Sequence, residues 1–251
     1  MNKKSQNKIL YVEGSGEGTT AEIRLNDIPI GHLSSGGDAE MKHIQVELNI
    51  VTGKNTLSVY PSSNKGKTIV RLVRYTEGDW VDGEGGETLL VIRTEHDDSP
   101  IHEDIELSKK RPDWCWLDAD IVTDRKSHKE AIAFAKSFYN DLKVVKNVNK
   151  IVTAFDPIFE DMSAIDPEIT LSIRTKELKE GLLKNSKKEI WQFDDIDTLS
   201  YTAIPVANGR LYDLRREDGS PLIRTSQNSK WDRITYRNII GRKNGVWQFY
   251  R

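Results

Sequence analysis

Apolar and polar residues alternate in short blocks over residues 8–94. A period of two places successive side chains on opposite faces of a strand, so each block predicts a half-buried β-strand. The clearest block alternates four apolar residues with polar ones: Ile44, Val46, Leu48 and Ile50. The predicted strands cover 8–12, 21–25, 44–51, 56–60, 69–75 and 87–94. Gly, Asn and Ser clusters separate them, which predicts an all-β sandwich with the piece that contains Pro29 at an edge.

The pattern changes to a helical period after this part of the chain. Ser127 and Glu130 have the spacing of a capping box, which predicts that a helix begins with Ser127 as its N-cap. A second apolar stripe covers 148–162, and Pro157 within it predicts a kink or a new helix start. Asp166, which a proline follows, predicts the N-cap of a third helix.

Residues 188–251 return to short strands separated by turns. Asn and Gly tolerate the positive φ angles that tight hairpins require. The three turns are Asn208-Gly209, Asp218-Gly219 and Asn244-Gly245. The predicted strands cover 199–206, 210–215, 222–225, 233–240 and 246–250. A sheet with one apolar face needs a cover, so we expect the preceding helices to pack on a curved antiparallel sheet.

A charged, proline-containing connection over 95–113 separates the two patterns. The chain has 251 residues, which suits two domains better than one small domain. The sequence therefore predicts a β-sandwich domain over 1–108 and an α+β domain over 109–251. Trp114 and Trp116 follow the connection directly, and we expect them to anchor the second domain as core residues.

Composition narrows the classes of partner. The formal net charge is −2, which gives no overall field that favours nucleic acid. No apolar run approaches the length that spans a bilayer, so membrane insertion is not expected. The apolar stretch after the first residues is too short for a signal peptide, and the expected location is the cytoplasm, or the periplasm where a leader was removed. Cys115 is the only cysteine, which excludes a disulfide within the chain.

Several polar clusters resemble chemical motifs without meeting their requirements. The run from Gly14 to Gly18 lacks the helix that a phosphate loop needs, which favours a flexible turn. The carboxylates over 79–87 and the acidic and histidine residues over 96–104 favour exposed loops over metal sites. Aspartates at 118, 120, 194, 195 and 197 favour solvated surfaces over a catalytic pair. Cys115, with His128 as its nearest candidate base, favours an inert thiol. We expect no enzyme activity, cofactor or metal.

Two parts of the chain resemble known families. The order of helices and then strands over about 118–251 resembles nuclear-transport-factor-like or cystatin-like domains, with the ending Gly245-Val246-Trp247-Gln248-Phe249. The first domain resembles the β-sandwich of bacterial two-domain proteins associated with type VI secretion and toxin–immunity loci. The segments that carry this resemblance are Ile23-Arg24-Leu25-Asn26-Asp27-Ile28-Pro29-Ile30 and Gly53-Lys54-Asn55-Thr56-Leu57-Ser58-Val59. The resemblance implies a protein that binds a cognate toxin and blocks it.

The leading hypothesis is therefore an immunity protein that neutralises a secreted toxin by binding it. Inhibition of this kind needs only a complementary surface with aromatic or arginine anchors. The candidate anchors are Trp80, Arg215, Arg216 and Trp231. Two alternatives stay open: a small-ligand-binding or hydrolytic protein that uses a cavity in the α+β domain, and a structural or adaptor component of a secretion system.

Overall fold

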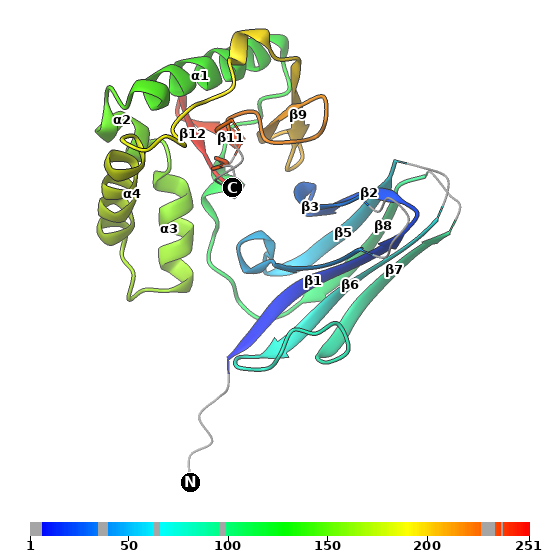
Figure 1. Ribbon diagram of the computed structural model, residues 1–251. Helices are drawn as coiled ribbons and strands as arrows, with labels where there is room; N and C mark the ends of the chain where they lie inside the picture. Colours follow the sequence, from blue (N-terminus) through cyan, green and yellow to red (C-terminus); the bar gives the residue numbers. More distant parts are fainter. Residues whose placement is uncertain (1–6, 35–39, 63–65, 96–98, 227–233, 237) are drawn as a thin grey trace. The chain divides into compact units, whose positions relative to one another are not determined.

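The computed structural model describes residues 7–34, 40–62, 66–95, 99–226, 234–236 and 238–251 (Figure 1). Contacts divide the chain into two compact units, Met1–Arg111 and Pro112–Arg251. The first unit is rich in β-strands, and the second combines helices with an antiparallel sheet. This agrees with the predicted order of a β-rich part and an α+β part. The predicted domains, 1–108 and 109–251, stay a prediction.

The first unit contains two four-stranded antiparallel sheets, in the orders β4-β1-β6-β7 and β3-β2-β5-β8. The strands are β1 (Lys8–Glu17), β2 (Thr20–Leu25), β3 (Ile28–Ser34), β4 (Glu40–Gln45), β5 (Gly53–Pro61), β6 (Lys67–Thr76), β7 (Glu87–Glu95) and β8 (Ile101–Leu107). Val12 and Leu72 of one sheet and Ile23 and Leu57 of the other belong to one buried cluster. Residues of both sheets therefore share one buried core.

Some local predictions for this unit hold. The strands predicted over 21–25, 56–60, 69–75 and 87–94 lie within β2, β5, β6 and β7. Asn26 and Asp27 both have positive φ angles, 54° and 61°, and form the turn from β2 to β3. Pro29 lies in β3, an edge strand, where its missing N–H removes no hydrogen bond from the centre of the sheet.

Gly14 and Gly16 lie inside β1, so the flexible turn predicted there is wrong. A Cβ atom on Gly14 would lie 2.8 Å from Ile23 Cδ1 of the opposite sheet. The glycine therefore permits close packing of the two sheets.

Two further predictions for the first unit are wrong. The strand predicted over 44–51 ends at Gln45, and a 3₁₀ helix, Glu47–Asn49, follows it. Val46 and Ile50 are nevertheless fully buried, because the turn of this helix returns both side chains to the core. The connection predicted over 95–113 contains β8, which pairs with β5 along its length.

The second unit places four helices before a sheet of order β12-β11-β10-β9. Its elements are α1 (Arg125–Val144), α2 (Val148–Thr153), α3 (Asp156–Ile165), α4 (Leu171–Asn185), β9 (Tyr201–Val206), β10 (Leu211–Arg216), β11 (Ile239–Lys243) and β12 (Val246–Phe249). Phe249 of β12 packs against Phe138 of α1 and Phe155, with ring centroids 4.7 and 4.9 Å apart. These rings join helices and sheet in one core. No helix in the described ranges is long and apolar enough to cross a membrane.

The helix boundaries differ in part from the prediction. The N-cap of α1 is Asp124, and Ser127 lies in the first turn and donates to the Asp124 carboxylate at 2.6 Å. The predicted restart near Pro157 is confirmed, because α2 ends at Thr153 and α3 begins at Asp156. Asp166 caps the end of α3 instead of starting the next helix, which begins after Thr170. A residue before proline is disfavoured in the helical region, so this step suits a helix end.

The final sheet is smaller than predicted. The hairpins at Asn208-Gly209 and Asn244-Gly245 are confirmed, with positive φ angles at all four residues. Among the described residues, the segment 222–225 forms isolated bridges to Phe193 and Thr235, and the Ile223 amide donates to the Asn238 side chain at 3.2 Å. Of the strand predicted over 233–240, residues 233 and 237 lie outside the described residues, and β11 begins at Ile239.

Candidate functional site

The outer face of the β4-β1-β6-β7 sheet carries two rows of side chains across its four strands. The antiparallel register aligns one side chain of each strand in each row. The first row contains Met41, Ser15, Ile69 and Arg93, and the second contains His43, Glu13, Arg71 and Val91. Because side chains alternate along a strand, the neighbouring residues point to the core instead.

A buried carboxylate organises the second row. Glu13 is only 4% exposed, and its Oε1 accepts a hydrogen bond from the Tyr75 hydroxyl at 2.5 Å. Its Oε2 lies 2.5 Å from Arg71 Nη2, and His43 Nδ1 lies 3.4 Å from Oε1. Burial, together with the Glu13 carboxylate, raises the pKa of Tyr75 to about 12, so the phenol keeps its proton and donates. This network fixes Arg71 and Tyr75 in position.

The loop from β6 to β7 folds over this face. The Gly83 carbonyl accepts a hydrogen bond from Arg71. A Cβ atom on Gly83 would lie 2.8 Å from Met41 Sδ, and the residue has a φ angle of 82°, so glycine allows the loop to approach the sheet.

The carboxylates of this loop close its turns. Asp82 Oδ1 accepts hydrogen bonds from the Glu84 and Gly85 amides, each at 2.9 Å, and these bonds lower the pKa of Asp82. Asp79 Oδ2 accepts from the Thr76 amide at 2.9 Å. Over the described ranges, no three His, Cys, Asp or Glu side chains gather closely enough to hold a metal ion.

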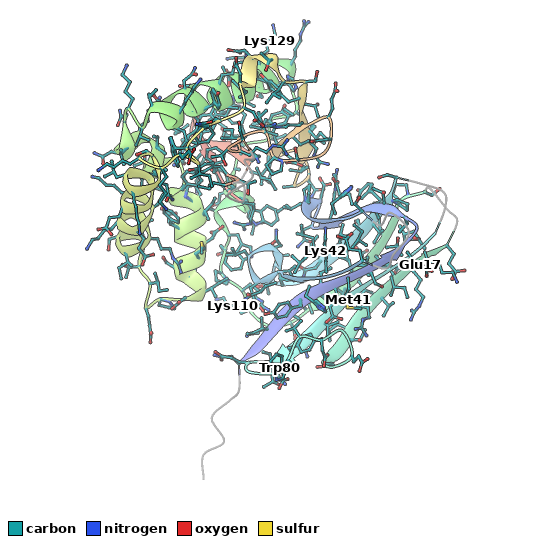
Figure 2. The ribbon with its side chains drawn as sticks, in the orientation of Figure 1. Glu17, Met41, Lys42, Trp80, Lys110 and Lys129 are labelled. Carbon is teal, nitrogen blue, oxygen red and sulfur yellow. The ribbon has the colours of Figure 1, made fainter. Side chains whose placement is uncertain are left out.

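A hollow of about 200 Å³ lies between the two rows and the loop. Its lining comprises Glu13, Gly14, Ser15, Met41, Ile69, Arg71, Gly83 and Arg93. Met41 is 56% exposed and Ile69 37%, and Trp80, in the loop that supplies Gly83, is 88% exposed. The side chains of Met41 and Trp80 are labelled in Figure 2. These are the exposed large hydrophobic residues in the described part of the first unit. We call Met41, Ile69 and Arg93 the rim of the hollow.

Arg93 differs from the other arginines of this sheet. Arg71 pairs with Glu13 and Arg74 with Glu87. Among the residues that the structure describes, no carboxylate lies within ion-pair distance of Arg93. Its guanidinium therefore remains able to bind an external carboxylate in a bidentate manner.

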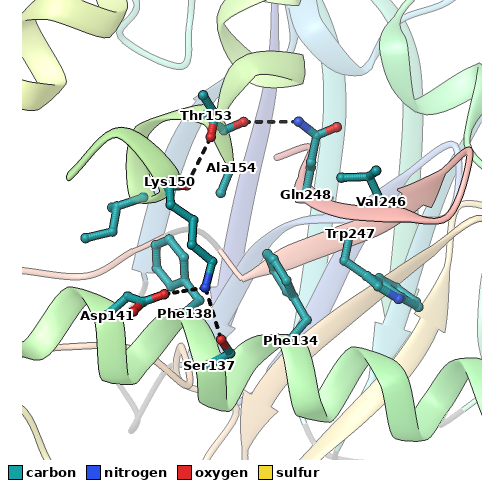
Figure 3. A pocket seen from close by; sticks show the side chains of 11 residues that line it. Phe134, Ser137, Phe138, Asp141, Lys150, Thr153, Ala154, Val246, Trp247 and Gln248 are labelled. Atoms are coloured by element: carbon teal, nitrogen blue, oxygen red, sulfur yellow. Dashed lines mark hydrogen bonds and ion pairs between the residues drawn. The ribbon is translucent and has the colours of Figure 1, made fainter. Parts of the chain in front are cut away.

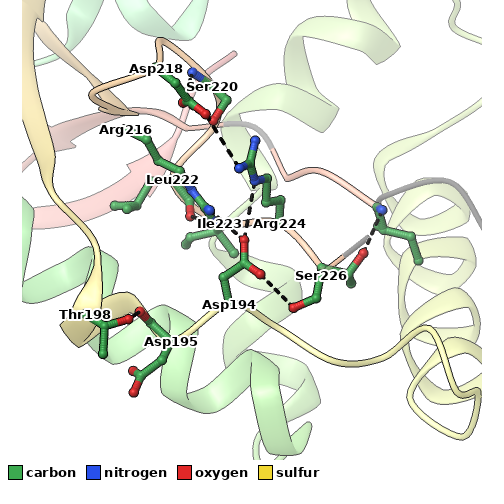
Figure 4. Close-up of polar contacts among 12 residues, drawn as sticks. Asp194, Asp195, Thr198, Arg216, Asp218, Ser220, Leu222, Ile223, Arg224 and Ser226 are labelled. Atoms are coloured by element: carbon green, nitrogen blue, oxygen red, sulfur yellow. Dashed lines mark hydrogen bonds and ion pairs between the residues drawn. The ribbon is translucent and has the colours of Figure 1, made fainter. Parts of the chain in front are cut away.

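The other predicted anchors lie in the second unit. Arg216 is 6% exposed, and it donates to Asp194 Oδ2 at 2.5 Å and to the Leu222 carbonyl at 3.1 Å (Figure 4). Arg215 Nε donates to Asp213 at 2.7 Å. Trp231 lies outside the described residues. The partner-binding roles of Trp80, Arg215, Arg216 and Trp231 stay predictions.

Asp194 is the centre of the network around Arg216 and not a solvated side chain, which corrects the sequence-based expectation. Burial alone would raise its pKa, but hydrogen bonds from the Ser226 hydroxyl at 2.6 Å and from Arg216 outweigh burial and lower the pKa. Arg224 Nε adds a contact at 3.5 Å. The carboxylate therefore stays ionised and stabilises the packing of this segment.

Cys115 has the environment of an inert thiol. Its Sγ donates to Glu160 Oε2 at 3.2 Å, and its backbone amide donates to Asp161. Burial and the negative charge of Asp161 raise the pKa of the Cys115 thiol well above its usual range. A protonated thiol is a poor nucleophile, so this cysteine does not resemble an activated catalytic group.

Trp80 is a candidate from the sequence alone, whereas Met41, Ile69 and Arg93 are not. These three residues lie on different strands, and only the pairing of distant segments brings them together. One signal was present in β6, where both alternating sets of side chains include large apolar residues. Such a strand is expected to have apolar groups on both faces, which indicates a second contact surface.

Comparisons with known proteins found no relative of this chain. No protein-family model, curated protein or solved structure matches the chain. The hollow and its rim are therefore interpreted from their own geometry and chemistry.

Proposed function

We propose that this protein is a non-enzymatic binding protein that recognises a partner protein through the outer face of the β4-β1-β6-β7 sheet. The observation that carries the proposal is the rim of the hollow, where two exposed apolar side chains line the same hollow as an arginine that has no ion-pair partner among the described residues. The exposed Trp80 lies in the loop that supplies Gly83 to this hollow. Tryptophan, methionine and arginine are enriched at the centres of protein interfaces.

The geometry indicates what the partner presents. Met41 and Ile69 flank the hollow and suit an apolar side chain of the partner. Arg93 suits a carboxylate next to that side chain. The Glu13 network already holds Arg71 and Tyr75, so binding orders few groups beneath the contact. A preorganised surface loses less entropy on association.

The partner that we propose is a cognate secreted toxin, and the function is to neutralise it. This step rests on the resemblance of the first part of the chain to proteins of toxin–immunity loci. Inhibition by binding requires no cofactor and no catalytic group, only coverage of the toxin by a complementary surface.

The test is co-purification with the product of the neighbouring gene, together with protection of cells that express that product. We expect Trp80→Ala and Arg93→Glu each to weaken the complex by at least about tenfold, because anchors of this kind dominate binding. Ile121→Ala and Arg125→Glu are matched controls, since both residues are exposed in the second unit, and we expect neither to change the affinity.

Absence of a complex and of protection would contradict the proposal. Weakening by the control substitutions to the same extent would show that the outer face of this sheet is not the contact. Stable association with components of a secretion machine, without a toxin complex, would favour the adaptor function instead.

A further inference from the structure

The second unit contains a pocket between α1, α2 and β12 (Figure 3). Its volume is about 360 Å³, within the range of small-molecule sites in proteins. The lining residues are Phe134, Ser137, Phe138, Asp141, Lys150, Ile151, Thr153, Ala154, Val246, Trp247 and Gln248. Helices and sheet thus both contribute walls.

One part of the pocket is apolar and held rigidly by packing. Phe134 and Phe138 both contact Phe249 of the core, with ring centroids 5.5 and 4.7 Å apart. Trp247 stacks on Tyr212 at 6.2 Å. Val246, which also lines this pocket, is 57% exposed. Open apolar surface beside fixed aromatic rings is favourable for burying a flat apolar group.

The opposite wall carries a charged group. Lys150 Nζ lies 2.5 Å from Asp141 Oδ2 and 3.3 Å from Ser137 Oγ, and Figure 3 shows it between these two side chains. An ammonium group has three N–H donors, and the described residues supply acceptors for two of them. Asp141 and Lys150 are the charged residues of the lining and pair with each other, whereas the neighbouring Lys143 and Lys146 do not line the pocket.

We propose that this pocket binds a small organic anion with a flat apolar body, specifically an aromatic carboxylate. The ring lies against Phe134, Phe138 and Trp247, and the carboxylate accepts the remaining N–H of Lys150. A carboxylate at this position combines the hydrogen bond with an ion pair to Lys150, whereas a neutral hydroxyl accepts only the hydrogen bond. The site lies wholly in the second unit and is independent of the proposed partner surface of the first.

The experiment is a titration of the whole chain with three probes that share one ring system: 2-naphthoate, 2-naphthalenemethanol and 2-naphthylmethylamine. Amide and indole signals are followed by two-dimensional NMR. We expect 2-naphthoate to shift the signals of residues 150–154 and the Trp247 indole, and to bind about tenfold more tightly than the neutral probe.

Two lysine variants then test the charged wall. Lys150→Met keeps an unbranched side chain, one atom shorter, and removes its charge, and we expect it to abolish the preference for 2-naphthoate while the neutral probe binds as before. Lys146→Met is the matched control, because Lys146 is exposed nearby and does not line the pocket. Equal affinity for all three probes, no shifts at these residues, or an equal effect of Lys146→Met would overturn the proposal.

Discussion

Asp161 and Arg251 form an ion pair in which each side chain is only 3% exposed and Arg251 Nη1 lies 2.6 Å from Asp161 Oδ2. Asp161 also accepts a hydrogen bond from the Cys115 amide at 2.8 Å. Removing the guanidinium leaves a buried carboxylate without its cation, which typically costs about 3–5 kcal/mol. We expect Arg251→Met to lower the free energy of unfolding by about 3 kcal/mol in urea denaturation.

The matched control at the residue scale is an exposed pair. Lys176 and Glu180 of α4 are 3.9 Å apart, with side chains 76% and 66% exposed. Water screens such pairs, so Lys176→Met is expected to change the free energy of unfolding by less than about 0.5 kcal/mol. If Arg251→Met and Lys176→Met lowered the free energy of unfolding equally, burial would not explain the stabilisation by the Asp161–Arg251 pair.

Asp194 gives a prediction about pH. Its pKa is lowered in the folded protein, despite burial, by hydrogen bonds from Ser226 and Arg216. A lowered pKa stabilises the fold above the ordinary aspartate value of 3.8, and this contribution is lost as the pH falls below it. We expect Asp194→Asn to be less stable than the unmodified protein at pH 7, with a difference that shrinks below about pH 4. Urea unfolding at several pH values measures this, and a difference that stays constant down to pH 2.5 would contradict it.

At the scale of elements, substitutions at the start of α1 distinguish the observed N-cap, Asp124, from the predicted one, Ser127. Hydrogen bonds from the Ser127 hydroxyl and from the Ser127 and Lys126 amides lower the pKa of Asp124 to about 2. Asp124→Ala removes these acceptors and leaves the buried Ser127 hydroxyl without its partner, whereas Ser127→Ala removes one bond. We therefore expect Asp124→Ala to lower the melting temperature more than Ser127→Ala does at pH 7.

The same cap predicts how this difference depends on pH. The folded-state pKa is below the ordinary value of 3.8, so the stabilisation by Asp124 is complete above that value and is lost as the pH falls toward about 2. Thermal unfolding followed by circular dichroism measures both variants across this range. A larger loss from Ser127→Ala, or a loss from Asp124→Ala that does not diminish at low pH, would contradict the assignment of the cap.

Elements were predictable where local residues determine them and not where distant partners do. The hairpin at Asn244-Gly245 follows from two residues that tolerate positive φ. By contrast, the sequence predicts a charged connection where β8 lies, because polar residues hide its alternation. Asp104 in β8 pairs with Lys54 and accepts a hydrogen bond from Thr56, both on β5. Cross-strand partners from a distant segment make a charged sequence a stable strand, and sequence periodicity does not reveal them.

At the scale of the whole molecule, the candidate site was predictable only through its most exposed residue. Trp80 stands out in a Gly-rich acidic loop, and its side chain is indeed exposed. Arg93 and Met41 become neighbours of the same hollow only after the sheet order β4-β1-β6-β7 is known. Arg216 is of a residue type that is common among interface anchors, but its side chain is buried and pairs with Asp194. Residue type therefore identified candidates, whereas burial and strand register determine which of them reach a surface.

The division into two compact units predicts two separate unfolding transitions in calorimetry. Ile23 is fully buried in the core of the first unit, and Phe138 is 4% exposed in the core of the second. Truncating either to alanine costs about 3 kcal/mol through lost burial and a remaining cavity. Because the two cores share no residues, Ile23→Ala is expected to lower the temperature of one transition and leave the other unchanged, and Phe138→Ala to do the reverse. If both variants shift one common transition, the units unfold together, and a boundary near residues 111 and 112 does not separate independent domains.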